Sequence, residues 1–178
     1  MQKLFKKNYS KIGILGGTFD PPHMGHLYIS KTALKKLRLD AIIWVIAKQN
    51  PLKQKPYLSI KTRMSLSKGM TKSQKKIFVE YLDDKIKSRT TFDVLNFLKK
   101  KNKKIKLFFL IGADNLIKFH KWNKWEKIPG LAKIIVFARP NYTAKALNSI
   151  ASKRLKKKDW MYINSKKMNI SSSLIRKF

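Results

Sequence analysis

The chain has 178 residues, 43% of them hydrophobic, so residues 1–178 can form one compact domain with a substantial core. The absence of cysteine excludes disulfide bonds and thiolate chemistry and favours a reducing compartment, and no apolar run approaches the roughly 20 residues that cross a bilayer. The 42 basic and 9 acidic residues give a formal net charge of +33, which would ordinarily suggest a nucleic-acid partner.

The distribution of this charge argues against such a partner. Lysines are spread along every predicted helix and loop, with short runs at 99–101 and 156–158. Arginine, whose planar guanidinium recognises bases and phosphates better, is scarce. We therefore expect a solvated lysine surface, no specific nucleic-acid partner and, because no signal-peptide apolar region follows the basic start, a cytoplasmic protein without a membrane partner. A basic RNA-binding protein stays as the alternative, and the oligomeric state is open.

Apolar runs alternate with helix-like patterns along the chain. This alternation is typical of βαβ units, and it predicts an α/β fold: a Rossmann-like, doubly wound parallel sheet flanked by helices in a single domain. The run AIIWVIA is apolar on both faces, as a sheet covered on both sides requires. Ligands are expected at the edge where the strands' carboxyl ends meet. Strands are predicted at 11–16, 41–47, 76–82, 105–111 and 133–138, and helices at 24–38, 59–70, 91–101 and 143–155, with short helices over 113–128.

The segment GGTFDPPHMGH, residues 16–26, directly follows the first predicted strand. Gly16 and Gly17 let the backbone turn sharply and approach a ligand closely. His23 and His26 are three residues apart at the start of the next predicted helix, so both imidazoles can point the same way. Free N–H groups and the helix dipole favour anions at that end, so this segment is predicted to hold the phosphates of a nucleotide.

Other interpretations of this segment fit less well. An isolated pair of histidines in this spacing is usually a surface feature, but here it lies in the strand, glycine turn and helix unit that a phosphate site requires. A metal site built by the protein is not expected, because there is no cysteine and no third ligand at matching spacing. Neither the P-loop pattern nor the dinucleotide pattern G-x-G-x-x-G is present.

A serine run near the carboxyl terminus is a second candidate anion site. Serines are good helix N-caps, and Ser172 and Ser173 would offer hydroxyls and free N–H groups to phosphates. Arg176, three residues after Ser173, would lie on the same helix face and could clamp phosphates with its planar guanidinium. An ordinary capped helix is the structural alternative.

Residues 17–26 resemble the H-x-G-H signature of the nucleotidyltransferase superfamily, and the FDPPH form is similar to that of nicotinate-nucleotide adenylyltransferases. ISSSLIR at 170–176 resembles that family's second signature, I-S-S-T-x-I-R. Each match is short, and their shared order along the chain carries the resemblance. The further matches are NPLK at 50–53, TFD at 91–93, GADN at 112–115 ahead of Trp122, and RP at 139–140.

The resemblance implies an enzyme that transfers AMP from ATP to nicotinate mononucleotide, giving deamido-NAD and pyrophosphate in NAD biosynthesis. The acceptor phosphate would attack the α-phosphorus in line without a protein nucleophile, so catalysis would rest on positioning and charge neutralisation. ATP would be a substrate, and Mg²⁺ would be held mainly by the phosphates. The implied catalytic residues are His23, His26 and Arg176. The implied ATP-binding residues are Gly16, Gly17, Thr18, Phe19, Lys53, Asp114, Arg139, Ser172 and Ser173.

For the mononucleotide, the resemblance implies a stacked ring and a bound carboxylate. Trp122 would stack on the nicotinate ring, and backbone N–H groups near Thr91 and Asn123 would hold the carboxylate. Core packing against Phe119 and Trp125 is the alternative for Trp122.

Three of the nine acidic residues, Asp20, Asp93 and Asp114, lie in motif segments, so we expect each to have an assigned partner. For Asp114 the resemblance implies a ribose hydroxyl. Lys53 would be a mobile counter-charge, and His120 is expected at the surface.

Two other acceptors are open within the same class of enzyme, nicotinamide mononucleotide and phosphopantetheine. Phosphopantetheine adenylyltransferases usually carry threonine where His23 stands. A cytidylyltransferase would share H-x-G-H but lack the segment 114–122. These differences favour nicotinate mononucleotide.

Overall fold

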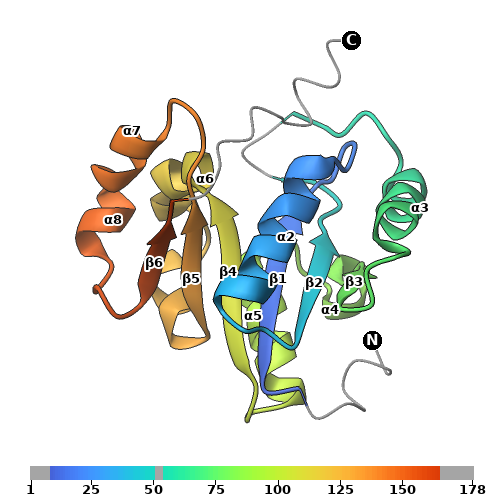
Figure 1. Cartoon of the computed structure of the whole chain (residues 1–178), viewed down its shortest axis with the longest axis horizontal. Coiled ribbons are helices and arrows are strands. Elements are labelled where there is room, and N and C mark those ends of the chain that lie inside the picture. The colour runs from blue at the N-terminus through green and yellow to red at the C-terminus, as the bar shows by residue number, and fades with distance from the viewer. Residues whose placement is uncertain (1–8, 51–53, 165–178) are drawn as a thin grey trace.

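The computed structural model describes residues 9–50 and 54–164. Within these residues, six strands form one parallel sheet in the order β3-β2-β1-β4-β5-β6, with helices on both faces (Figure 1). The strands are β1 (Lys11–Gly17), β2 (Ala41–Ile46), β3 (Ile77–Glu80), β4 (Lys106–Gly112), β5 (Ala132–Phe137) and β6 (Trp160–Ile163). The α-helices are α2 (Met24–Lys36), α3 (Ile60–Thr71), α4 (Asp83–Ile86), α5 (Thr91–Lys101), α6 (Ala113–Lys118), α7 (Thr143–Leu147) and α8 (Ile150–Arg154), and the 3-10 helices are η1 (Phe119–Lys121) and η2 (Trp125–Gly130).

The strands separate two hydrophobic cores, one on each face of the sheet. Along β2 the side chains alternate between them: Ile43 belongs to the core under α5 and the α6 to α8 group, whereas Ile42 and Trp44 belong to the core under α2 and α3. This alternation follows from the two-residue period of a strand. It explains why the apolar run of β2 has no polar face.

The chain builds the sheet in two directions from its centre. From β1 it runs outward through β2 to β3, and then returns to place β4 on the other side of β1, so that Leu15 pairs with both Trp44 and Leu110. The strand order therefore reverses between β1 and β4, which is where ligands bind in open parallel sheets. The predicted doubly wound fold is confirmed.

One predicted helix is divided in the structure, and two short elements were not predicted. The helix predicted over 143–155 is two short helices, because the Ser149 side chain caps α8 by accepting from the Ser152 N–H at 3.2 Å. Strand β6 and helix α4 were not predicted: each is only four residues long, too short for a periodic pattern. The helix expected at the serine run 171–173 lies outside the described residues.

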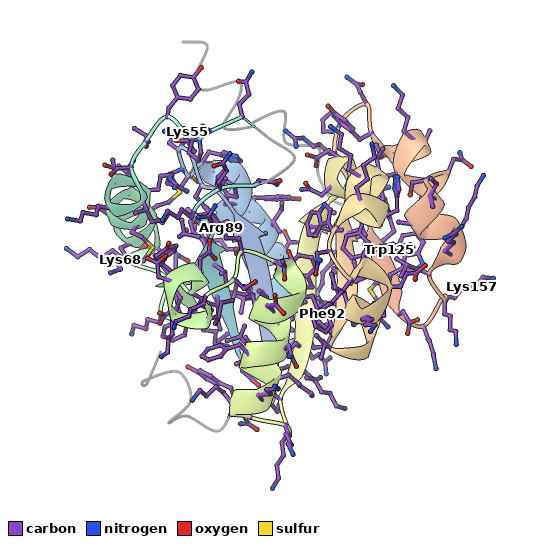
Figure 2. The ribbon with its side chains drawn as sticks, turned by 180° about the vertical axis from the view of Figure 1, so that it is seen from behind. Lys55, Lys68, Arg89, Phe92, Trp125 and Lys157 are labelled. Carbon is purple, nitrogen blue, oxygen red and sulfur yellow. The ribbon has the colours of Figure 1, made fainter. Side chains whose placement is uncertain are left out.

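Most of the lysine side chains among the described residues are exposed to solvent. Figure 2 shows Lys55 and Lys68 on one half and Lys157 on the other, and all three are exposed. This spread fits the expected solvated surface.

Candidate active site

The turn after β1 is held by a buried aromatic ring. The positive φ falls on Phe19, at 49°, rather than on Gly16 or Gly17. This left-handed conformation is uncommon for a residue with a side chain. The Phe19 ring is 1% exposed and stacks on Trp44 with ring centroids 5.0 Å apart, so packing maintains the strained turn.

Asp20 connects this turn to the segment that leads into α3. Its carboxylate is 2% exposed and accepts hydrogen bonds from the backbone N–H groups of Tyr57 and Leu58, both at 2.9 Å. Burial of a carboxylate is costly unless hydrogen bonds compensate it. Asp20 therefore has the assigned partners that its place in the motif predicted.

His23 and His26 lie side by side at the start of α2, with ring centroids 3.8 Å apart. His23 is the N-cap: its Nδ1 accepts from the Gly25 N–H at 3.1 Å, and Nδ1 of His26 accepts from the His23 N–H at 3.1 Å. Since Nδ1 is an acceptor in both neutral rings, the proton of each ring is on Nε2. The helix cap thus provides two adjacent Nε2–H donors.

The charge state of His23 follows from its surroundings. Burial lowers the pKa of His23 to about 4, and the positive charge of Arg139 contributes in the same direction. His23 is therefore neutral at pH 7. A neutral imidazole with its proton on Nε2 donates one hydrogen bond at that atom and keeps Nδ1 for the helix cap.

Asp114 and Arg139 form an ion pair beyond the ends of β4 and β5. Arg139 Nη1 lies 2.6 Å from Asp114 Oδ2, whereas Asp114 Oδ1 is buried and has no hydrogen-bond partner among the described residues. A Cβ at Gly112 would lie 2.5 Å from Oδ1, which explains the glycine at this position. A buried carboxylate oxygen without a partner is suited to accept a ligand hydroxyl.

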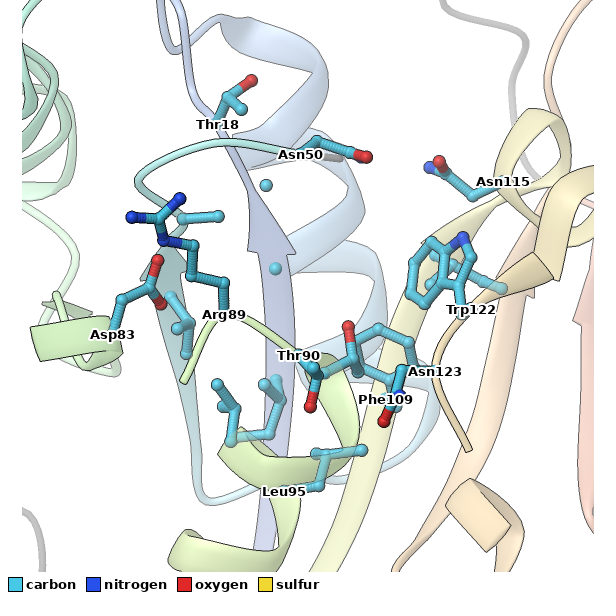
Figure 3. Close-up of a pocket in the computed structure, with 18 of the residues that line it drawn as sticks. Thr18, Asn50, Asp83, Arg89, Thr90, Leu95, Phe109, Asn115, Trp122 and Asn123 are labelled. Carbon is cyan, nitrogen blue, oxygen red and sulfur yellow. The ribbon is translucent and has the colours of Figure 1, made fainter. Parts of the chain in front are cut away.

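A cavity of about 310 Å³ opens at the carboxyl ends of β1, β2 and β4 (Figure 3). This volume is within the range of small-molecule sites. Both apolar and polar side chains line it. From the predicted site, the lining residues are Gly16, Gly17, Thr18, Thr91, Trp122 and Asn123.

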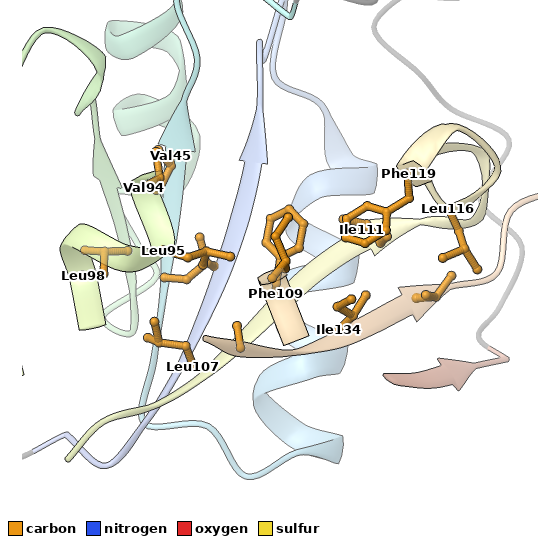
Figure 4. Close-up of a cluster of buried hydrophobic side chains, with 14 of the residues drawn as sticks. Val45, Val94, Leu95, Leu98, Leu107, Phe109, Ile111, Leu116, Phe119 and Ile134 are labelled. Carbon is orange, nitrogen blue, oxygen red and sulfur yellow. The ribbon is translucent and has the colours of Figure 1, made fainter. Parts of the chain in front are cut away.

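Trp122 both lines the cavity and packs on the core. Its ring centroid is 6.0 Å from that of Phe109 and 5.2 Å from that of Phe119. Both phenylalanines belong to the buried cluster of Figure 4. Trp125 contacts Phe119 edge-on at 6.0 Å but is not part of the cavity wall. Core packing of Trp122 is thus present, and its place in the cavity wall leaves the stacking role a prediction.

The start of α5 offers backbone donors to the same cavity. Thr90 is the N-cap, and its hydroxyl accepts from the Asp93 N–H at 3.1 Å. Asp93 accepts in return from the hydroxyls of Ser88, at 2.6 Å, and Thr90, at 2.8 Å, and these bonds lower the pKa of Asp93. The cap holds the first turn of α5, and with it Thr91, against the cavity.

The structure adds charged residues to the site that the sequence motifs did not identify. Asp83 and Arg89 lie together on one side of the cavity (Figure 3), and Lys121 is a third charged lining residue. Asp83 is 5% exposed and accepts from the Lys48 N–H at 2.8 Å, and burial is the main cause that raises the pKa of Asp83. Its position directly after a predicted strand was the signal that could have identified it.

The remaining predicted residues fall into two groups. His23, His26, Phe19, Asp114 and Arg139 are described but do not line the cavity itself. Lys53, Ser172, Ser173 and Arg176 lie outside the described residues.

The expected surface position of His120 was wrong. This residue is only partly exposed, and its Nδ1 is buried with no hydrogen-bond partner among the described residues. The short helix η1 places it beside α8, which the sequence pattern did not indicate.

Among residues 9–50 and 54–164, no group of three or more His, Cys, Asp and Glu side chains could hold a metal ion. In the same part of the chain, no helix is long and apolar enough to cross a membrane.

Comparison with known proteins identifies the family of this chain. The family model described as cytidylyltransferase-like matches residues 14–178. A protein of Pelagibacter ubique is 47% identical over 168 residues, which cover 94% of this chain and 93% of the relative. A protein of Bradyrhizobium sp. (strain ORS 278) is 32% identical over 93% of this chain and 95% of its own length. Both are named "Probable nicotinate-nucleotide adenylyltransferase".

Solved structures share the fold. The Plasmodium falciparum nicotinic acid mononucleotide adenylyltransferase complexed with NaAD superimposes with a TM-score of 0.75, at 21% identity, over 95% of this chain and 83% of that one. The same enzyme complexed with APC gives a TM-score of 0.74. At this identity the likeness establishes the common architecture of the sheet and its helices.

Proposed function

This chain belongs to the cytidylyltransferase-like family and, by its relatives, to the nicotinate-nucleotide adenylyltransferases, and from that premise we propose how its site works. It transfers the adenylyl group of ATP to nicotinate mononucleotide. The products are deamido-NAD and pyrophosphate, and the reaction serves the synthesis of NAD.

The observation that carries the proposal is the pair of imidazoles that cap α2. Their Nδ1 atoms accept backbone N–H groups, which places the proton of each neutral ring on Nε2. In the reaction, an oxygen of the mononucleotide phosphate attacks the α-phosphorus of ATP, and the bond to pyrophosphate breaks. His23 and His26 donate to the phosphoryl oxygens as negative charge develops there. Neither residue has to gain or lose a proton.

The acceptor lies in the cavity. Trp122 provides a stacking surface for the nicotinate ring, and N–H groups at the start of α5, near Thr91, and near Asn123 hold its carboxylate. This places the acceptor phosphate toward Gly16 and Thr18, which line the same cavity at the end of β1.

The nucleotide is bound by groups on both sides of the sheet's switch point. Backbone groups of Gly16, Gly17, Thr18 and Phe19 surround its phosphates, and Asp114 Oδ1 accepts a ribose hydroxyl while Arg139 holds the other carboxylate oxygen. Four further residues are assigned from the sequence signatures alone: Lys53, Ser172 and Ser173 as phosphate-binding groups and Arg176 as the clamp on the leaving phosphates.

Mg²⁺ would be held mainly by the oxygens of the triphosphate, where it would supply charge neutralisation. A cytoplasmic location is proposed because a chain without cysteine fits a reducing compartment.

Pyrophosphate release with ATP and each candidate acceptor tests the proposal. We expect nicotinate mononucleotide to exceed nicotinamide mononucleotide by about 10–100-fold in kcat/KM, because N–H donors placed for a carboxylate are poorly matched by an amide. Equal kcat/KM for the two would remove the nicotinate assignment and leave adenylyl transfer intact. A preference for phosphopantetheine would replace the acceptor altogether.

A further inference from the structure

Arg63 is a buried cation behind the site. It lies on the inner face of α3, is 2% exposed and does not line the cavity. Its guanidinium donates four hydrogen bonds, all to backbone carbonyl oxygens. These run from Nε to Leu58 at 3.1 Å, from Nη1 to Thr18 and Ala47, both at 2.7 Å, and from Nη2 to Lys48 at 3.0 Å.

The four carbonyls belong to three segments that are distant in sequence. Thr18 is in the turn after β1, Ala47 and Lys48 follow β2, and Leu58 leads into α3. One side chain thus joins the two strand ends that flank the cavity to the helix behind them. A lysine could not reproduce this, because its ammonium is a compact point charge without the planar, five-donor geometry of a guanidinium.

Two of these bonds also fix peptide groups next to the cavity. The Thr18 carbonyl shares its peptide plane with the N–H of Phe19, the residue with positive φ, and the Lys48 carbonyl shares its plane with the N–H of Gln49, a cavity-lining residue. A hydrogen bond to the carbonyl of a peptide sets the direction of its N–H and strengthens it as a donor. Arg63 therefore acts on donors that it does not itself touch.

Neighbouring contacts hold the same segments in register. The Ala47 N–H donates to Gly17 O at 2.8 Å, and the Lys48 N–H donates to Asp83. Asp20 connects the same two segments. It belongs to the turn that Arg63 holds, and its carboxylate accepts hydrogen bonds from the N–H groups of Tyr57 and Leu58, which lead into α3. The turn and the approach to α3 are thus bonded in both directions.

The burial of this charge has a cost. Desolvation lowers the pKa of Arg63, and the negative charges of Asp20 and Asp83 oppose that shift. A buried charge is often less stabilising than an apolar side chain of similar volume. A role in positioning the backbone around the site would offset this cost.

We infer that Arg63 is a positioning residue for adenylyl transfer, which orients the peptide groups after β1 and β2 toward the phosphates that react. The inference rests on the proposed function. It predicts that loss of the guanidinium lowers kcat through geometry, while the nicotinate end of the acceptor, which contacts Trp122 and the start of α5, is bound as before.

The test compares Arg63→Lys and Arg63→Met with Arg154→Met as the matched control. Arg154 is exposed on α8, and its 3.7 Å ion pair with Glu126 lies outside the site. Rates are measured well below the melting temperature and divided by the folded fraction from circular dichroism. For Arg63→Lys we expect kcat to fall on the order of 10²-fold while the KM for nicotinate mononucleotide changes several-fold at most.

A merely structural role would give a different result. Loss of activity in proportion to the unfolded fraction, with kcat per folded molecule equal to that of the parent, would overturn the inference, as would a KM increase that accounts for the whole effect. Arg63→Lys keeps the charge and most of the volume, so it decides the question if Arg63→Met does not fold. Failure of the proposed function is separate, since it would appear as an inactive parent protein.

Discussion

His26 has two nitrogen atoms with different tasks, and this division can be tested at a single residue. Nδ1 accepts the N–H of His23 and completes the cap of α2, and Nε2 carries the proposed catalytic donor. Asparagine places its side-chain oxygen near the position of Nδ1 and has no group near that of Nε2. His26→Asn therefore separates the cap from the donor.

We expect His26→Asn to lower kcat about 10²–10³-fold, the usual cost of losing one transition-state donor, with little change in melting temperature. His26→Ala should lose as much activity and, because it also removes the cap, have a lower melting temperature. Steady-state kinetics and thermal unfolding of both variants measure this. A kcat for His26→Asn within about twofold of the parent would contradict the assigned role.

The protonation of His23 is set by burial first and by Arg139 second. Arg139→Gln should therefore raise the pKa of His23 from about 4 but leave it below the ordinary 6.5, because burial persists. A two-dimensional NMR titration of the three histidine rings measures the shift. Arg154→Gln is the control, and an unchanged pKa in Arg139→Gln would show that the two side chains do not interact.

The same pKa has a consequence for stability. The folded-state pKa of His23 lies below its unfolded value, so the unfolded chain binds more protons between pH 6.5 and about 4. The contribution of His23 to stability is complete above that window and is lost as the pH falls through it.

At the level of single residues, the sequence predicts what short motifs encode. The adjacency of His23 and His26 follows from their spacing on a helix, and the partners of Asp20 were expected from its place in the motif. Asp83 follows a predicted strand and could have been identified from that position, but Arg63 could not be recognised in this way. Its contacts depend on segments that come together only when β1, β2 and α3 pack, which is information that no local pattern holds.

Among the elements, the turn between η1 and η2 presents the ring that is proposed to bind the acceptor. Trp122 and Trp125 both contact Phe119, but only Trp122 lines the cavity. This pair of tryptophans provides an internal comparison, since replacement of either one removes a similar core contact.

Trp122→Leu should raise the KM for nicotinate mononucleotide about 3–10-fold, from the loss of an aromatic stacking partner, and raise the KM for ATP less. Trp125→Leu should lower the melting temperature by a similar amount and leave both KM values close to those of the parent. Initial-rate measurements with each substrate varied in turn provide the comparison. Equal increases in the two KM values for Trp122→Leu would indicate general distortion of the site in place of stacking.

The elements that the sequence predicted are those with several buried positions in a regular period. β2 is buried along its whole length, and its apolar run is visible without any structural knowledge. β6 pairs only with β5 within the described sheet. Its four residues are a strand because they pair with β5, and their own sequence pattern does not predict one. The break between α7 and α8 lies at the side-chain cap of Ser149, and serine favours turns as well as caps, so the residue type alone does not predict a helix boundary.

At the scale of the whole molecule, the distribution of the positive charge distinguishes an enzyme with a lysine-rich surface from a nucleic-acid-binding protein. The lysines are dispersed over the surface (Figure 2), whereas two arginines, Arg63 and Arg139, are bonded within the described fold. A dispersed positive surface attracts any polyanion by counterion release, without reading its sequence.

We expect labelled RNA to bind weakly at near-physiological salt, without sequence preference and with affinity that falls steeply as salt rises. Saturating ATP should compete little, because it occupies one cleft while the lysines extend over the whole surface. A fluorescence titration with two unrelated RNA sequences, with and without ATP, measures both points. Nanomolar, sequence-selective binding would contradict this expectation and make the enzymatic function incomplete as a description.

The reversal of strand order at the centre of the sheet also determines at which stage of folding the site is assembled. β1 is made near the start of the chain, but its second neighbour, β4, is complete only after residue 112, and their pairing closes a long loop of chain. Until then β1 has one unpaired edge, and Phe109 and Trp122 are absent from the wall that faces Thr18. Substrate binding is therefore gained in the same event that joins the two halves of the sheet, which is the strand pairing with the longest sequence separation in the described sheet.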